Sequence, residues 1–196
     1  MTLARKSALR VTALIAALLA VAIYLTLAAS QQNAIAELGG SFKLASSNGG
    51  EVDSASLVGQ PYGVFFGFSH CPEVCPTTLY NMTKSLASLG SDAKYFRLFF
   101  VTVDPERDTA PVLKDYLSNF DPRIEALVPT MQQLPVIARQ FHAYYEKVPG
   151  SDGEYTMNHT ALIYLFNAQG RFTSTIAYDE SLQGRETKLK NLITNN

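Results

Sequence analysis

Runs of apolar and polar positions separate buried strands from amphipathic helices along this chain. Compact apolar runs predict two buried strands, at residues 63–68 and 95–103. The segment 77–89 between them is predicted to be a helix, because apolar side chains recur at helical spacing at Leu79, Met82, Leu86 and Leu89. Strand, helix and strand in this order predict a right-handed parallel βαβ unit.

The rest of the pattern surrounds this unit with further short elements. An amino-terminal hairpin is expected over residues 40–53, where Asn48-Gly49 is a strong turn signal. In chain order the later predictions are helices at 110–119 and 131–141, a strand at 144–148, a turn at 149–152, paired strands at 161–166 and 172–176, and a polar helix at 181–193. Together they predict an α/β fold with a mixed sheet and helices on both faces, which is the thioredoxin-like arrangement.

The amino terminus has a different pattern, which is typical of a segment that targets a protein to a membrane. Residues 11–29 contain neither a charge nor a proline, and as a helix they would span about 28 Å, close to the apolar thickness of a bilayer. We therefore predict a basic leader at 1–10, a transmembrane anchor at 11–29, a tether at 30–38 and a folded domain at 39–196. A cleavable signal peptide ending near Ala28-Ala29-Ser30 is the alternative.

The three charges before this apolar run are all positive: Arg5, Lys6 and Arg10. The positive-inside rule keeps them in the cytoplasm and sends the domain across the membrane. The expected location is the inner (cytoplasmic) membrane, crossed once, with the soluble domain in the oxidising periplasm.

Composition and charge exclude several classes of protein. The chain has 196 residues, 47% of them hydrophobic, which is enough for one domain with a real core and argues against disorder. Three of the 16 basic residues and none of the 17 acidic ones lie in the first 30, so the remainder has a net charge of −4. A mildly acidic domain without a basic tract is a poor nucleic-acid binder. Two cysteines exclude a disulfide-rich scaffold.

Those two cysteines, Cys71 and Cys75, lie between a predicted buried strand and a predicted helix. Reactive loops of parallel sheets lie at the carboxyl ends of strands, and a helix amino terminus favours the thiolate form. With three residues between them, the two Cβ atoms would be about 5–6 Å apart on a helix, whereas a disulfide prefers about 3.5–4.5 Å. A metal ion fits this separation better, and two thiolates select a soft ion such as Cu(I).

A third ligand would come from one of three histidines. His70 is expected to point away from Cys71 and either to support the site from outside the ligand set or to face solvent, and His142 is expected to pack among aromatic residues. His159 directly precedes the strand predicted at 161–166, at the end of a segment that we expect to be mobile. If that strand runs antiparallel to the one at 63–68, His159 lies beside the cysteines. Asp104, at the end of the second parallel strand, is expected either to orient His159 or to bind loop amides.

Four motifs of the chain resemble the Sco family (also called SenC or PrrC), the membrane-anchored copper chaperones of cytochrome c oxidase assembly. They are GGSFKL at 39–44, GFSHCPEVCPT at 67–77, VDPERDT at 103–109 and NHT at 158–160. The resemblance implies a thioredoxin-like domain that binds copper through Cys71, Cys75 and His159. Glu73 and Asn158 depart from the family pattern, which often has Asp at both positions, but neither departure removes a ligand.

The resemblance implies delivery of copper to the dinuclear copper centre of the oxidase. Its expected partners are the copper-centre subunit, other copper carriers and thiol reductants. A thiol–disulfide reductase that keeps the oxidase cysteines reduced, with Cys71 and Cys75 as its redox pair, is the alternative, and a redox sensor stays open. A peroxidase is disfavoured because the required Pro and Thr are absent at Val64 and Phe68. Structural zinc is disfavoured because closed zinc sites usually need four ligands. Binding of Cu(II) is left open.

Overall fold

The computed structural model describes residues 15–24, 38–150 and 153–194, in two units that divide after Glu37. In the first unit, residues 15–24 form a helix with exposed side chains. The remainder of the predicted anchor at 11–29 lies outside the described residues, as do the leader and most of the tether. Among the residues that are described, no helix is both long enough and apolar enough to span a bilayer.

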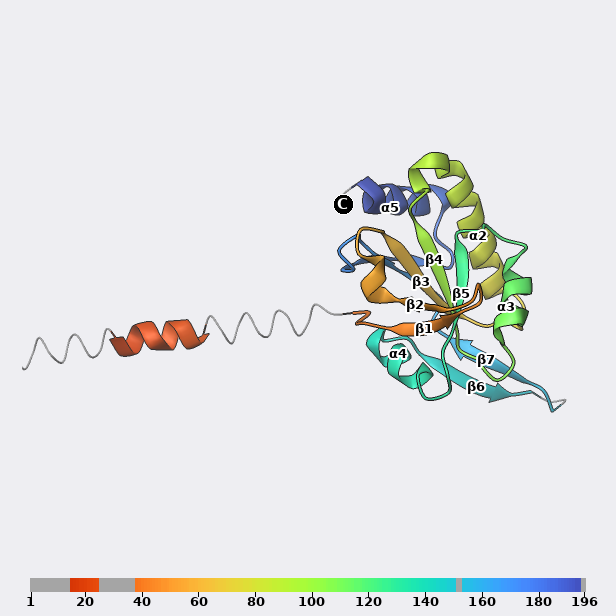
Figure 1. Cartoon of the computed structure of the whole chain (residues 1–196), viewed down its shortest axis with the longest axis horizontal. Helices are drawn as coiled ribbons and strands as arrows, with labels where there is room; N and C mark the ends of the chain where they lie inside the picture. The colour runs from red at the N-terminus through yellow and green to blue at the C-terminus, as the bar shows by residue number, and fades with distance from the viewer. Residues whose placement is uncertain (1–14, 25–37, 151–152, 195–196) are drawn as a thin grey trace, which may run out of the picture. The chain divides into compact units, whose positions relative to one another are not determined.

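The second unit is built on a seven-stranded mixed sheet in the order β2-β1-β5-β4-β3-β8-β9 (Figure 1). Its strands are β1 (Lys43–Ser46), β2 (Glu51–Asp53), β3 (Tyr62–Gly67), β4 (Arg97–Thr102), β5 (Ile124–Val128), β8 (Leu162–Phe166) and β9 (Phe172–Ala177). Every residue of β3 is buried, and this strand pairs parallel with β4 and antiparallel with β8. The predicted βαβ unit and the predicted antiparallel return strand are therefore confirmed.

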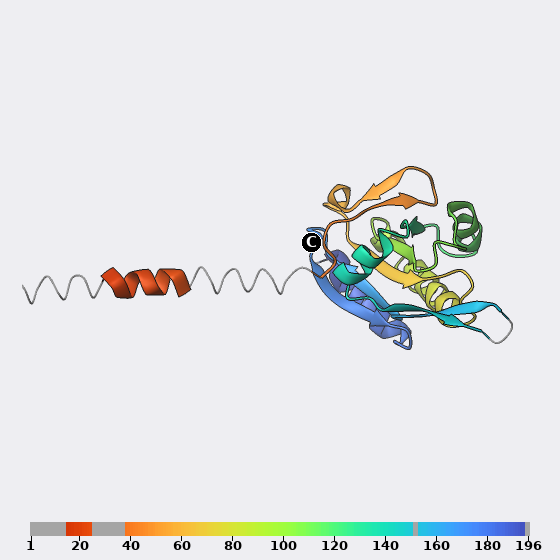
Figure 2. The same ribbon diagram turned by 90° about the horizontal axis from the view of Figure 1, so that it is seen from below.

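Two further strands, β6 (Tyr145–Pro149) and β7 (Tyr155–His159), form a separate antiparallel ribbon (Figure 2). The helices are α2 (Val74–Leu89), α3 (Ala110–Leu117), α4 (Leu134–Gln140) and α5 (Leu182–Thr194), with 3-10 turns at Ser54–Leu57 and Gly90–Ala93. Helix α2 packs against α5, and α3 packs against β5.

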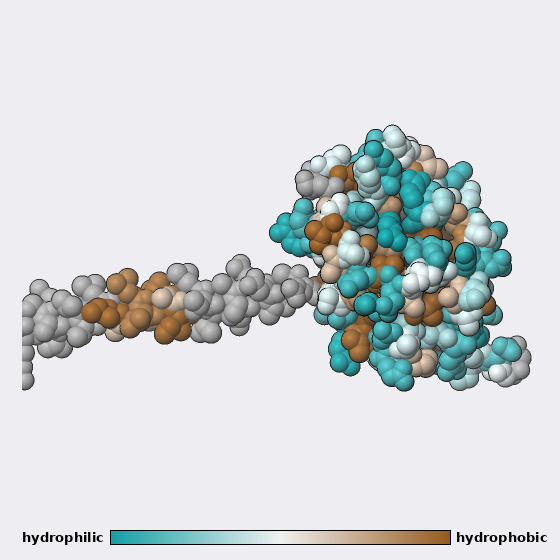
Figure 3. Space-filling model, viewed as in Figure 1, coloured by the Kyte–Doolittle hydropathy of each residue, from teal (hydrophilic) through white to brown (hydrophobic). Residues whose placement is uncertain are grey.

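Aromatic side chains fill both faces of the sheet. On one face, Phe141 at the end of α4 is fully buried, and its ring lies 5.4–6.2 Å from the centroids of four others, namely Phe42, Phe66, Tyr164 and Phe166. On the opposite face, Phe65 contacts Phe100, which in turn contacts Tyr116 of α3. Mostly hydrophilic side chains cover the side of the domain drawn in Figure 3. The sheet is thus a packed central layer with helices on both faces, as predicted.

Two strands escaped prediction from the pattern. Strand β5 has the sequence IEALV, whose Ala and Glu are not typical of strands, and it is held by pairing between β4 and β1. Buried Glu125 is stabilised there by Arg97 and Ser46. Strand β7 replaces the mobile segment expected before His159, because each of its residues pairs with β6. Both strands depend on partners distant in sequence, which local patterning does not reveal.

Replacing Phe141 by Ala tests the aromatic layer under α4. Removing a fully buried aromatic side chain leaves a cavity, so the free energy of unfolding should fall by about 3–5 kcal/mol. Urea denaturation of the folded domain measures this loss as a lower midpoint with unchanged slope. The control is Val136→Ala on the same helix, where the side chain is 54% exposed and the change should stay below about 1 kcal/mol. Equal losses would contradict the packing described.

Candidate metal centre

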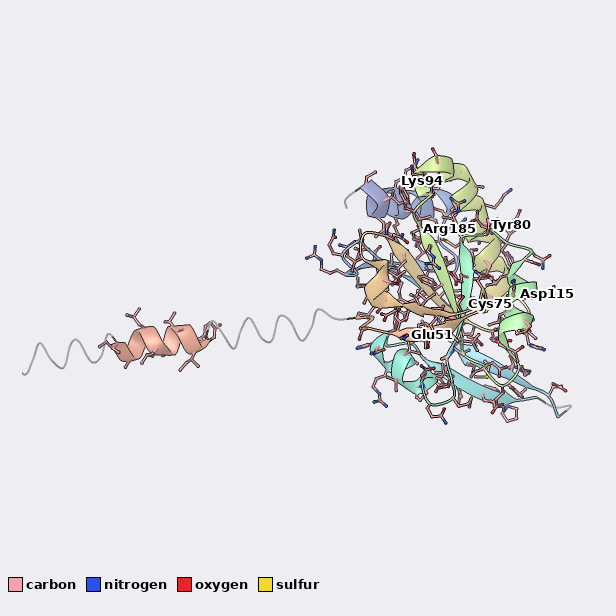
Figure 4. The ribbon with its side chains drawn as sticks, in the orientation of Figure 1. Glu51, Cys75, Tyr80, Lys94, Asp115 and Arg185 are labelled. Atoms are coloured by element: carbon pink, nitrogen blue, oxygen red, sulfur yellow. The ribbon has the colours of Figure 1, made fainter. Side chains whose placement is uncertain are left out.

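The two cysteines lie at the connection between strand β3 and helix α2. Cys71 is half-buried in the loop, and Cys75 is fully buried in the first turn of the helix (Figure 4). Glu73 occupies the position before the helix, yet its side chain forms no cap. Instead the Cys75 backbone N–H donates to the Cys71 sulfur at 3.4 Å, so this sulfur serves as an acceptor at the helix amino terminus.

Strand pairing brings His159 to the same place. Because β8 runs antiparallel to β3, its start lies beside the end of β3, and only two residues separate His159 from β8. The imidazole Nε2 is 3.4 Å from the Cys75 sulfur. The ligand atoms of Cys71, Cys75 and His159 all lie within 4.8 Å of one another.

The contact of the second imidazole nitrogen indicates which tautomer the neutral ring would adopt. Nδ1 of His159 lies 3.1 Å from the backbone oxygen of Thr160, and a carbonyl oxygen only accepts hydrogen bonds. Nδ1 is therefore the donor to Thr160, and in the neutral ring with this tautomer Nε2 would carry the lone pair that faces the cysteine sulfurs. Metal-binding histidines usually donate their other N–H in this way, which fixes the orientation of the ring.

The two thiols differ sharply in acidity. A hydrogen bond from the Cys75 thiol is the main cause that lowers the pKa of Cys71 to about 4, with a further contribution from His159 against the effect of burial. The same hydrogen bond and burial raise the pKa of Cys75 far above its usual range. Without metal, the pair therefore carries one negative charge at neutral pH, on the more exposed sulfur.

Neighbouring residues shape the centre tightly. The rings of Phe65 and Phe68 lie edge-on to His159, with centroids 6.2 and 5.8 Å away. A Cβ at Gly67 would lie 2.8 Å from the Cys75 sulfur, so the strand needs glycine there. Fully buried Asp108 accepts hydrogen bonds from the Ser69 N–H and hydroxyl, which tie the cysteine loop to the loop after β4. These bonds join residues that are 39 positions apart in the sequence.

Three sequence predictions about nearby residues have different outcomes. His70 is exposed and bonds to Ser69, as expected for a solvent-facing residue outside the group. His142 is exposed at the end of α4, so its predicted packing is wrong; Phe141 takes the buried position because His142 has a positive φ of 51° that turns the chain. Asp104 was predicted either to orient His159 or to bind loop amides; among the described residues its carboxylate instead binds the side chains of Arg107 and Tyr155. Tyr155, to which Asp104 binds, lies at the opposite end of β7 from His159.

The fold and this group define a class of protein, a thioredoxin-like α/β domain with two cysteines and one histidine converging at a strand end. A family model described as SCO1/SenC matches residues 30–194. A SCO2-like protein of Rickettsia felis is 35% identical over 147 residues, covering 74% of this chain and 72% of that protein. This chain therefore belongs to the SCO1/SenC family, as its motifs indicated.

Solved structures agree with this assignment. The structure of Bradyrhizobium japonicum ScoI with copper bound is 42% identical and has a TM-score of 0.74, covering 79% of this chain and 99% of that one. BsSco, described as a member of the Sco family of cytochrome c oxidase assembly proteins with a disulfide switch, is 21% identical with a TM-score of 0.64. The match covers 82% of this chain and 96% of the BsSco chain. At this low identity, the likeness shows a shared fold alone.

Alkylation of Cys71 by iodoacetamide tests its acidity. With a pKa of about 4, Cys71 is fully thiolate from pH 6 to 8, so its alkylation rate should be nearly constant over this range. Cys75→Ala removes the dominant hydrogen bond, so the pKa should rise and the rate should increase several-fold between pH 6 and 8. The readout is mass spectrometry of the metal-free, reduced protein. A wild-type rate that rises about tenfold per pH unit would contradict the lowered pKa.

Proposed function

We propose that this protein is a copper metallochaperone that binds Cu(I) through Cys71, Cys75 and His159. The observation that supports this most is the convergence of two sulfurs and one imidazole nitrogen within 4.8 Å. Sulfur ligands favour a soft ion, and imidazole suits copper as well. The donor set also has three members among the described residues, whereas closed zinc sites usually have four.

The three ligands differ in their exposure to solvent, and this difference provides a route for the release of copper. Cys71 is half-buried and lines an open pocket with Pro72, Asn158 and His159, whereas Cys75 is sealed beneath the loop. A thiolate from a recipient protein enters from the pocket side and forms its bond to copper as a bond to Cys71 or His159 breaks. Copper moves from one thiolate set to another without a change of oxidation state, which is ligand exchange.

The recipient in this proposal is the dinuclear copper centre of cytochrome c oxidase. BsSco is described as a member of the Sco family of cytochrome c oxidase assembly proteins, ScoI of Bradyrhizobium japonicum has been solved with copper bound, and this chain matches the SCO1/SenC family model. The domain's net negative charge suits a recipient surface with basic residues around the acceptor site.

A thiol–disulfide reductase is the second candidate, favoured by the low pKa of Cys71. Its thiolate would attack a disulfide in the recipient, forming a mixed disulfide and releasing one recipient thiolate. The Cys75 thiol, after losing its proton, would then displace the second recipient thiolate and leave a Cys71–Cys75 disulfide. Two electrons pass to the recipient, and an external dithiol reductant would restore the pair. Both cysteines are free thiols in the structure, and Cys71 is outside the helix, where such a bridge needs it.

Titration with Cu(I) against a competing chelator tests the chaperone proposal. We expect one Cu(I) per protein, and His159→Ala should weaken binding at least about tenfold because it removes a ligand. His142→Asn is the matched control, since His142 is exposed elsewhere and Asn tolerates its positive φ. Unchanged affinity in His159→Ala would leave the reductase as the better explanation.

We also propose that residues 11–29 anchor the protein in the inner membrane, with the domain in the periplasm. The support is the uncharged length of this segment and the basic residues Arg5, Lys6 and Arg10 before it.

Fractionation of cells that express the full chain tests the anchor. The protein should remain with membranes after a carbonate wash and lose its domain to protease only when the outer membrane is opened. Replacing Leu18 and Leu19 with Lys should release it from the membrane fraction, because charges in a bilayer are costly. Recovery of a shortened wild-type chain in the soluble fraction would instead establish a cleaved signal peptide.

A further inference from the structure

The position of His159 depends on the β6–β7 ribbon, which is not part of the main sheet. At the base of the ribbon, Tyr144 and Thr160 exchange two hydrogen bonds. The Tyr144 N–H donates to the Thr160 hydroxyl at 2.9 Å, and the Thr160 N–H donates to the Tyr144 oxygen at 3.0 Å. These bonds join the two chain segments at the base of the ribbon. The tilt of the ribbon relative to the main sheet depends on other contacts.

Besides the packing of Met157 in the core, polar contacts to the ribbon come from the loop after β4. The Asp104 carboxylate accepts from the Tyr155 hydroxyl at 2.8 Å and from the Arg107 Nε at 2.5 Å. Arg107 Nη1 also donates to the backbone oxygen of Tyr155 at 3.0 Å, and its guanidinium lies 3.6 Å from the centre of the Tyr155 ring. Arg107 thus contacts both the ring and the backbone of Tyr155. It also binds Asp104, the carboxylate that accepts the hydrogen bond of the Tyr155 hydroxyl.

These interactions lie in a partly buried place, where they are screened less than at an open surface. Asp104 is 3% exposed and the Arg107 side chain 19%. Burial, assisted by the bond to Asp104, raises the pKa of Tyr155 to about 12, so its hydroxyl remains a donor at neutral pH. The outer pair, Lys147 with Glu106, is half-exposed and is expected to add little.

The ribbon transmits the position of Tyr155 to His159. The two residues lie four apart on β7 and therefore on the same face, with Met157 buried between them. All five residues of β7 pair with β6, which makes this short segment stiff. A displacement at Tyr155 consequently moves the imidazole relative to Cys75.

We propose that Arg107, Asp104 and Tyr155 form a latch that positions His159, so that opening it converts a three-ligand copper site into a two-thiolate site ready for handover. This inference rests on the proposed chaperone function. Arg107 Nη2 is buried without a hydrogen-bond partner among the described residues, so the closed latch leaves one donor unsatisfied. An unsatisfied donor offsets part of the stabilisation and favours a latch that opens.

Two latch variants of the full chain test this proposal. Arg107→Gln removes the stacking and the ion pair, while Tyr155→Phe removes only the hydroxyl bond to Asp104. We expect Arg107→Gln to weaken Cu(I) binding about tenfold, as loss of support for a metal ligand usually does, and Tyr155→Phe to weaken it less. X-ray absorption should show a reduced nitrogen contribution at copper, and transfer of copper to a chelator should be faster.

The matched control is Arg97→Gln. Arg97 also pairs with a carboxylate, Glu125, and its guanidinium lies over an aromatic ring, that of Phe99, at 4.8 Å, but at the opposite end of β4. This variant should lose stability yet keep copper affinity and nitrogen coordination. In the His159→Ala background, Arg107→Gln should have no further effect on affinity, because the residue it positions is gone.

The results separate the latch from the function beneath it. If His159→Ala weakens Cu(I) binding while Arg107→Gln and Tyr155→Phe leave affinity and coordination at wild-type values, the latch is wrong and the chaperone proposal stands. If His159→Ala itself binds as wild type does, the chaperone proposal fails first. Should Arg107→Gln not fold, Tyr155→Phe decides alone: unchanged coordination overturns the latch.

Discussion

The antiparallel pairing of β3 with β8 is the constraint on which the site depends. Strand β3 ends at the cysteine loop, and the return direction of β8 places the residue pair Phe65 and Ile163 side by side, just short of that loop. His159 reaches Cys75 only because β8 begins there. A parallel β8 would start at the other end of β3, roughly 20 Å away for a six-residue strand. Complete burial of β3 makes a slip in this pairing costly, because it would disrupt a core of aromatic side chains.

Within this arrangement, differences in burial and hydrogen bonding give the two cysteine side chains different protonation states. Cys75 is buried and keeps its proton, which it donates towards Cys71, whereas Cys71 is half-buried and ionised. Nδ1 of His159 is engaged by the backbone oxygen of Thr160, which leaves Nε2 as the nitrogen that faces the sulfurs. A soft cation therefore finds the Cys71 thiolate and the His159 imidazole available for binding. Binding to Cys75 as the third ligand requires the loss of one proton from that thiol.

Much of the fold followed from local patterning, and the failures share one cause. The buried strands β3, β4 and β8 and helix α2 have strong apolar patterns, and all were predicted within a few residues. Strands β5 and β7 are short and partly polar, and each is stabilised by partners distant in sequence: Arg97 supports Glu125, and Arg107 supports Tyr155. His142 was misplaced because neighbouring aromatic residues suggested burial, whereas the backbone turn directs only Phe141 into the core.

The amino-acid sequence by itself determined the chemistry available to this protein. The spacing of Cys71 and Cys75, a histidine before a buried strand and four family motifs are all local features that can be recognised without coordinates. Only the tertiary structure decided the distance from sulfur to imidazole, which nitrogen of His159 faces the cysteines, and the contacts of Asp104 with Arg107 and Tyr155. The physical reason is that ligand type is a property of single residues, whereas ligand position depends on contacts between segments as many as 84 residues apart.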